Sequence, residues 1–95
     1  MEIYTNTNGS IFGIQMYNFN DDGISNVFFE QTYEEVMSCV QLREMYYLYS
    51  LLANKNKILF NIYTESSSTV SDRIMVWQPF PLDTFLEIFG KCVKV

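Results

Sequence analysis

The clearest hydrophobic pattern in the chain is a helical period that runs from Thr32 to Ala53. Apolar side chains recur there every three to four residues, as in an amphipathic helix. Thr32 and Glu35 form a capping-box pair, which would start the helix by satisfying backbone amides of its first turn. This period predicts a core-facing stripe of Tyr33, Val36, Met37, Val40, Tyr47, Leu48 and Leu51.

Two features of this helix go beyond simple amphipathicity. Glu44 falls within the predicted core-facing side, where its carboxylate must either meet a cation or reach water past the edge of the stripe. The opposite side is also apolar, and a helix that is apolar nearly all round is covered on both sides. Another element of the chain or a partner should therefore cover a second, outer stripe, made of Leu42, Met45, Tyr46, Tyr49 and Leu52.

Alternating apolar and polar residues predict five strands, at Glu2–Thr7, Ser10–Phe19, Ile24–Glu30, Ile58–Thr64 and Arg73–Gln78. Asn8-Gly9 is a strong hairpin signal, because both central residues of a type I′ turn need positive φ. Asn20-Asp21-Asp22-Gly23 predicts a second turn. Gly13 inside a strand indicates a bulge or a close backbone approach. The first thirty residues are thus expected to form a three-stranded meander.

The last third of the chain predicts a short helix. Pro79 and Pro81 end the fifth strand, Asp83 can cap a helix over Thr84–Phe89, and Gly90 can close it. The tail, Lys91–Val95, is expected to fray.

The order strand-strand-strand-helix-strand-strand-helix predicts one α+β domain over residues 1–95, a two-layer sandwich with an antiparallel sheet of about five strands. The long helix would lie across one sheet face, and the short helix could cover part of the outer stripe. The sheet residues expected beneath the long helix are Phe12, Ile14, Phe60, Ile62, Ile74 and Val76.

Composition narrows the classes of partner. The 95 residues carry a net charge of −5, which argues against direct binding to a nucleic-acid backbone and fits a partner with a basic groove. An acidic nucleic-acid mimic is a weaker alternative, because the carboxylates are scattered along the chain. The two cysteines, Cys39 and Cys92, show no disulfide or metal spacing, so a reducing, cytoplasmic setting is the simpler expectation. No signal peptide or apolar run of membrane-spanning length is apparent.

The usual catalytic and metal-binding patterns are missing from the sequence. The chain has no histidine, which removes histidine-based triads and most zinc sites. No glycine-rich phosphate loop occurs. Asp21-Asp22 is better explained as a turn than as a cation loop, and Glu34-Glu35 as a helix start than as an acid–base pair. We therefore predict no enzymatic activity, no metal and no cofactor.

The predicted sheet has a second face that is unusually apolar. An antiparallel sheet usually places polar side chains there. This face instead carries Tyr17, Phe19, Leu59, Tyr63, Met75 and Trp77. Such a face indicates a contact surface. RNA-binding sheets also display aromatic residues, but beside basic ones, and here only Arg73 lies near. Alternatively, the short helix and the Pro79–Pro81 segment could fold under the sheet and bury these side chains.

The sequence therefore predicts a non-catalytic module that binds a larger protein as an inhibitor. Size and charge alone give an analogy to viral and mobile-element anti-defence proteins, such as anti-CRISPR proteins, and to toxin-neutralising immunity proteins. A homodimeric structural or regulatory protein is the alternative. The predicted contact residues are Tyr17, Tyr63, Met75 and Trp77 on the sheet, with Tyr46, Tyr49 and Glu44 on the helix.

Overall fold

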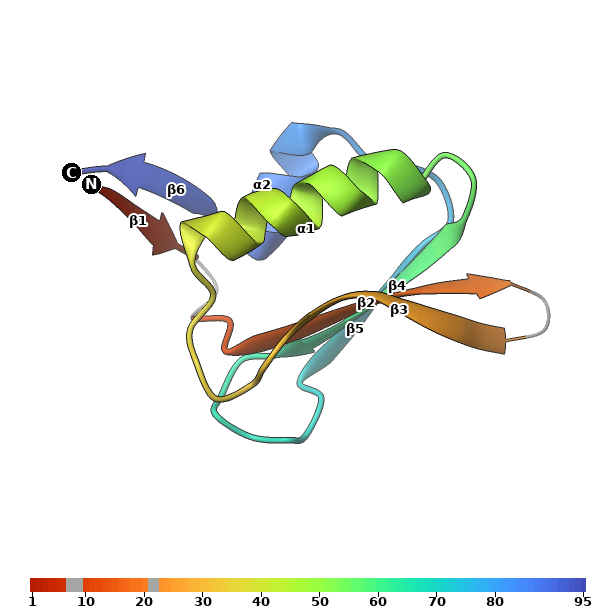
Figure 1. Cartoon of the computed structure of the whole chain (residues 1–95), viewed down its shortest axis with the longest axis horizontal. Coiled ribbons are helices and arrows are strands. Elements are labelled where there is room, and N and C mark those ends of the chain that lie inside the picture. Colours follow the sequence, from red (N-terminus) through yellow and green to blue (C-terminus); the bar gives the residue numbers. More distant parts are fainter. Residues whose placement is uncertain (7–9, 21–22) are drawn as a thin grey trace.

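The elements of the chain form a four-stranded antiparallel sheet, a separate two-stranded sheet and two helices (Figure 1). The computed structural model describes residues 1–6, 10–20 and 23–95. The α+β class and the predicted element order are confirmed, with one further strand at the C-terminus. The elements are β1 (Glu2–Thr5), β2 (Gly13–Asn20), β3 (Gly23–Gln31), α1 (Cys39–Leu52), β4 (Lys57–Tyr63), β5 (Asp72–Val76), α2 (Leu82–Phe89) and β6 (Lys91–Lys94).

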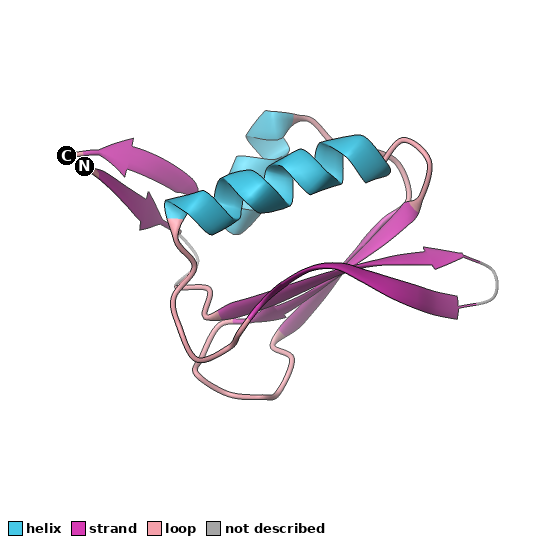
Figure 2. Ribbon diagram, viewed as in Figure 1, coloured by secondary structure: helices cyan, strands magenta, loops and turns pink. Residues whose placement is uncertain are grey.

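The main sheet has the strand order β3-β2-β4-β5, and both helices lie over the same face of it (Figure 2). Met16 pairs with Phe29 on one side and with Phe60 on the other, and Phe60 pairs with Ile74. Paired residues point to the same side of a sheet, so these four side chains face the helices together. Ile14 and Ile62 form a neighbouring pair, and both are buried. The predicted core face of the sheet is therefore confirmed for its residues within β2, β4 and β5. Phe12 is the exception, because it precedes β2 and its neighbour Ile11 joins the core instead.

β1 does not join the main sheet, which corrects the predicted three-stranded meander. It pairs instead with β6, from Glu2 opposite Lys94 to Thr5 opposite Lys91. The two chain ends consequently lie side by side (Figure 1), and the Val95 amide donates to the Met1 carbonyl at 2.9 Å. The tail that was expected to fray is thus a strand, because β1 supplies its backbone partners. The turns predicted at Asn8-Gly9 and at Asp21-Asp22 fall on residues outside the described part of the chain.

A disulfide joins Cys39, the first residue of α1, to Cys92 in β6, with the two Cα atoms 5.8 Å apart. The interpretation of both cysteines as unpaired was wrong. Their distance in sequence concealed a contact that exists only because β6 returns beside the start of α1. The predicted reducing environment rested on free thiols, and it loses that support.

The N-cap of the long helix is Ser38 rather than Thr32. The Ser38 hydroxyl accepts from the Gln41 amide at 3.3 Å, and the Ser38 amide donates to Gln41 Oε1 at 2.8 Å, so the capping box lies six residues later than predicted. The Gln31 side-chain amide donates to the carbonyls of Phe12 and Glu35, at 3.1 and 2.6 Å. These bonds hold the preceding segment against the sheet as a turn, which prevents an earlier helix start.

The predicted inner and outer sides of α1 are reversed. Leu42 is 4% exposed and Leu51 is 54% exposed, although Leu51 was placed in the core-facing stripe. Val40 and Tyr47 are exposed with Leu51, whereas Met37, just before the helix, is buried as predicted. Glu44 is exposed on this solvent side, so its carboxylate reaches water, one of the two outcomes that the sequence predicted.

A cluster of aromatic rings explains why the other side of α1 is buried. Phe85 of α2 lies with its ring centroid 5.1 Å from that of Tyr46 and 5.5 Å from that of Tyr49. Phe89 reaches the sheet, where its ring lies 4.6 Å from that of Phe60. The Tyr49 hydroxyl accepts from the Phe80 amide at 3.0 Å, and burial raises the pKa of Tyr49. α2 therefore fills the angle between α1 and the sheet and covers the stripe predicted to be the outer one.

Gly90 ends α2 in a conformation that favours glycine, as expected. Its φ is +106°, and a Cβ there would lie 2.5 Å from the Thr5 carbonyl oxygen and 2.6 Å from a ring carbon of Tyr4. Pro81, rather than Asp83, occupies the N-cap position, and Asp83 lies in the first turn. Gly90 thus permits the close contact between the end of α2 and β1.

Replacing Gly90 by alanine should lower the free energy of unfolding by about 1–3 kcal/mol, because the new Cβ adds both backbone strain and a clash with β1. Urea unfolding followed by circular dichroism measures this change. Lys91→Ala is the control, since Lys91 is the exposed neighbour in the chain and should change stability little. Equal stability of Gly90→Ala and the unmodified protein would contradict this role.

Candidate functional site

The main sheet turns one face away from both helices (Figure 2), and an apolar row crosses all four strands on this face. Val27, Tyr17, Leu59 and Met75 are paired in register across the sheet. Leu59 is buried between its neighbours, Tyr17 is half-buried, and Val27 and Met75 at the two ends are exposed. We name this row, together with Phe19 and Trp77, the sheet contact surface.

Trp77 is the most prominent side chain of the sheet contact surface. It is 61% exposed, although its ring makes an edge contact with Phe19 at a centroid distance of 5.4 Å. The Lys57 ammonium lies 4.9 Å from the centroid of the Trp77 ring, within the range of a cation–π interaction. These two contacts fix the indole against the end of β2 and β4 while most of its surface stays accessible.

A polar row lies beside the apolar one. Gln15 pairs with Glu30 on β3 and with Asn61 on β4, and Asn61 pairs with Arg73 on β5. Gln15 Nε2 donates to Glu30 Oε2 at 2.8 Å, and the Tyr63 hydroxyl donates to Gln15 Oε1 at 3.0 Å. The face is therefore divided into an apolar half around Trp77 and a hydrogen-bonded polar half.

The segment after β3 covers the far end of this face. The Tyr33 ring lies 5.5 Å from the Tyr63 ring, and Tyr63 is only 7% exposed. A Cβ on Gly13 would lie 2.6 Å from the Tyr33 Cα, so the predicted close backbone approach at Gly13 is confirmed. Tyr63 is therefore a support beneath Tyr33 rather than an exposed anchor.

Apart from Tyr63, which is buried beneath Tyr33, the structure separates the predicted contact residues into three groups. Met75, Trp77 and Tyr17 lie together on the accessible sheet face. Tyr46 and Tyr49 belong to the aromatic cluster under α2, so the helix stripe on which they were predicted is not an open surface. Glu44 lies on the solvent side of α1, beside the exposed Val40 and Tyr47.

Sequence reasoning missed one residue of the sheet contact surface, Val27, and one accessible surface, on α1. Val27 was not recognised because the pairing of β2 with β3 shifts between Met16 and Tyr17, which breaks the strict alternation of β3. The solvent side of α1 carries Val40, Tyr47 and Leu51, and it was missed because these residues were assigned to the core. We name these three residues the helix surface.

The short helix does not fold under the sheet. α2 lies on the same side as α1 (Figure 1), and Phe80 stacks on Tyr49 at a centroid distance of 5.0 Å. The alternative in which α2 and the Pro79–Pro81 segment bury the second sheet face was therefore wrong. This placement leaves Met75 and Trp77 accessible.

The described part of the chain contains neither a cluster of metal-binding side chains nor a membrane-spanning helix. No group of three or more histidine, cysteine, aspartate or glutamate side chains is placed there to hold a metal ion. No helix in the same ranges is long and apolar enough to cross a membrane. Comparisons of the chain with protein-family models, with curated proteins and with solved structures give no match.

Proposed function

We propose that this protein is a small, non-catalytic binding module that docks on a larger protein through the sheet contact surface and inhibits it. The observation that carries this proposal is Trp77, a tryptophan that is 61% exposed yet held in place by Phe19 and Lys57. Tryptophan and tyrosine dominate the energetics of protein interfaces. A fixed indole loses little conformational freedom on binding, which favours affinity.

The neighbours of Trp77 support a docking role. Val27 and Met75 are exposed on the same face, in line with the half-buried Tyr17. Methionine and aromatic residues are enriched at interfaces, and a rim of polar groups usually surrounds such a core. The Gln15, Glu30 and Arg73 row supplies polar groups along one side. The surface thus combines an apolar centre with hydrogen-bonding groups at its border.

The partner we propose has an apolar recess that admits the indole and a basic surface around it. The net charge of −5 would accelerate association with such a partner and make its rate depend on salt. The more specific analogy to anti-defence inhibitors rests on size and charge alone. It becomes testable once the partner is identified.

Trp77→Ala should keep the fold and weaken partner binding by about 2 kcal/mol or more, the loss typical of an interface hot spot. The partner is first captured from cells that contain this protein and identified by mass spectrometry, and the affinity is then measured with purified proteins. Tyr47→Ala is the matched control, because Tyr47 is 62% exposed but belongs to the helix surface on the other side of the molecule. The control should bind normally.

The opposite pattern, in which Tyr47→Ala loses binding and Trp77→Ala keeps it, would transfer the function to the helix surface.

A homodimeric structural or regulatory protein is the second candidate function, and exposed Val40, Tyr47 and Leu51 on one side of α1 favour it. A single helix stripe of this kind is suited to pairing with its own copy in an isologous dimer. Solution mass from light scattering decides this, with Leu51→Glu expected to dissociate a dimer formed through α1.

A further inference from the structure

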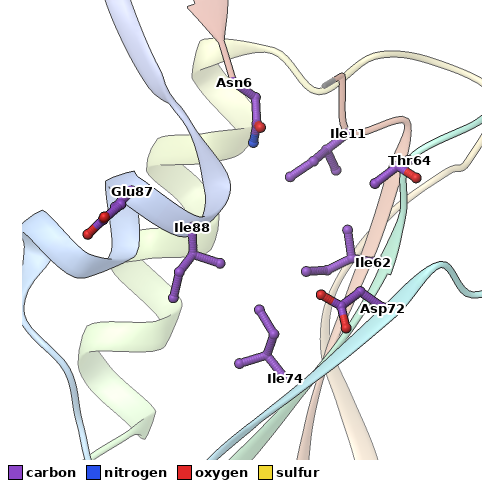
Figure 3. Close-up of a pocket in the computed structure, with 8 residues that line it drawn as sticks. All are labelled: Asn6, Ile11, Ile62, Thr64, Asp72, Ile74, Glu87 and Ile88. Carbon is purple, nitrogen blue, oxygen red and sulfur yellow. The ribbon is translucent and has the colours of Figure 1, made fainter. Parts of the chain in front are cut away.

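A cavity of about 390 Å³ opens between the core face of the main sheet and α2 (Figure 3). It lies on the side of the sheet opposite to the sheet contact surface, because its sheet residues, Ile62 and Ile74, belong to the core face. Its volume falls within the range of small-ligand pockets. The cavity is therefore a second candidate site, separate from the proposed docking surface.

The walls of this cavity are mainly aliphatic. Ile11, Ile62, Ile74 and Ile88 come from four different parts of the chain, and their side chains point toward one another across the space (Figure 3). Ile11 and Ile62 are buried, whereas Ile74 and Ile88 are half-buried toward the opening. Such walls favour a hydrocarbon chain, since each buried methylene contributes about 0.8 kcal/mol. They offer no ring-sized aromatic contact among the described lining residues.

One charged group is directed into the cavity. The Asp72 carboxylate lies at the edge of β5 and turns toward the isoleucines, whereas the Glu87 carboxylate points away from them (Figure 3). Asp72 Oδ1 accepts from the Arg73 amide at 2.8 Å, and no described residue donates to Oδ2. No lysine or arginine occurs among the described residues that line the cavity. The local charge therefore favours a cation over a neutral or anionic ligand.

We propose that this cavity binds a primary ammonium group carried on an unbranched aliphatic chain. The chain lies between the isoleucines, and the ammonium group meets the Asp72 carboxylate at the opening. A free alkylamine and the side chain of a lysine share this chemistry. Binding here does not depend on the sheet contact surface, so this proposal and the proposed function can fail separately.

The test is an NMR titration of the labelled protein with n-pentylamine, 1-pentanol and pentanoate, which share a carbon chain and differ in charge. We expect saturable shifts at Ile62, Ile74 and Ile88, with n-pentylamine binding about fivefold or more tightly than 1-pentanol and pentanoate binding weakest. A factor of five corresponds to the upper range for an exposed ion pair. A blocked lysine, Nα-acetyl-lysine N-methylamide, is titrated in parallel. Tighter binding of n-pentylamine would identify a free alkylamine as the ligand, and tighter binding of the blocked lysine would identify a lysine side chain.

Two isosteric variants separate the carboxylates. Asp72→Asn should remove the preference for the amine over the alcohol, and Glu87→Gln should retain it, because Glu87 lines the same cavity but points away. The dispersion of the amide spectrum verifies that both variants are folded. The proposal would be overturned if the unmodified protein bound the amine and the alcohol equally, or if neither amine bound. It would also be overturned if the shifts lay elsewhere in the molecule, or if Glu87→Gln alone lost the preference for the amine.

Discussion

Leu42→Ala is expected to lower the free energy of unfolding by about 2–5 kcal/mol, the usual cost of truncating a buried leucine. Leu42 is 4% exposed and belongs to the hydrophobic core cluster that joins α1 to α2 and the sheet. The loss combines the transfer of the leucine atoms with the cavity that remains. In a domain of this size it is a large share of the total stability. Chemical denaturation followed by circular dichroism measures it.

Leu51→Ala provides a matched control on the same helix. Leu51 is 54% exposed, and the same chemical change should cost less than about 1 kcal/mol there, since surface substitutions rarely cost more. The comparison removes helix propensity as a cause, because the two variants exchange the same residue types within α1. A larger loss in Leu51→Ala than in Leu42→Ala would show that α1 packs through its other side.

The sequence predicted the two faces of the main sheet well, because the face on which a side chain lies depends on alternation within its own strand. Ile58, Phe60 and Ile62 alternate within β4, and alternation alone decides which of their side chains share a face. The same argument placed Met75 and Trp77 on the second face, where the structure also has them. Strand periodicity therefore predicted five of the six residues of the sheet contact surface, all but Val27.

The orientation of α1 was not predictable in this way, because both of its sides are apolar. Val40 and Leu51 on one side are as hydrophobic as Leu42 and Met45 on the other. The choice between them depends on α2, whose Phe85 packs on the second side. That contact joins residues far apart in the sequence, and no local pattern records it.

The start of α1 was misjudged for a related reason. Thr32 with Glu35 and Ser38 with Gln41 are both acceptable capping boxes by residue type. The second is used because Gln31 binds the Glu35 carbonyl and thereby holds the intervening turn. A tertiary hydrogen bond, rather than capping chemistry, decides between them.

The pairing of the chain ends was the largest omission. β1 and β6 are short, no turn joins them, and neither shows a strong pattern of its own. Their pairing also brings Cys92 to Cys39, so the disulfide could not be expected without it. The Tyr4 hydroxyl donates to the Phe89 carbonyl, which fastens the same sheet to the end of α2.

Removing the Cys39–Cys92 disulfide, through a Cys39→Ala/Cys92→Ala double variant, should lower the free energy of unfolding by about 2–4 kcal/mol. The bridge closes a loop with a sequence separation of 53 residues, so it restricts the unfolded chain strongly. It also anchors β6, and with it β1, to the start of α1. Hydrogen exchange should therefore increase most at the amides of β1 and β6, which make few other contacts with the core.

The reducing agent dithiothreitol supplies the matched control. Reduced unmodified protein should unfold at about the same denaturant concentration as the double variant, and the double variant itself should not respond to dithiothreitol. Alkylation before and after reduction, read by intact mass, shows whether the thiols are paired. If both cysteines are alkylated in the unreduced, folded protein, the bridge does not form in solution. The backbone hydrogen bonds between β1 and β6, the Tyr4 contact and the Arg43–Glu2 ion pair would then hold these strands in place.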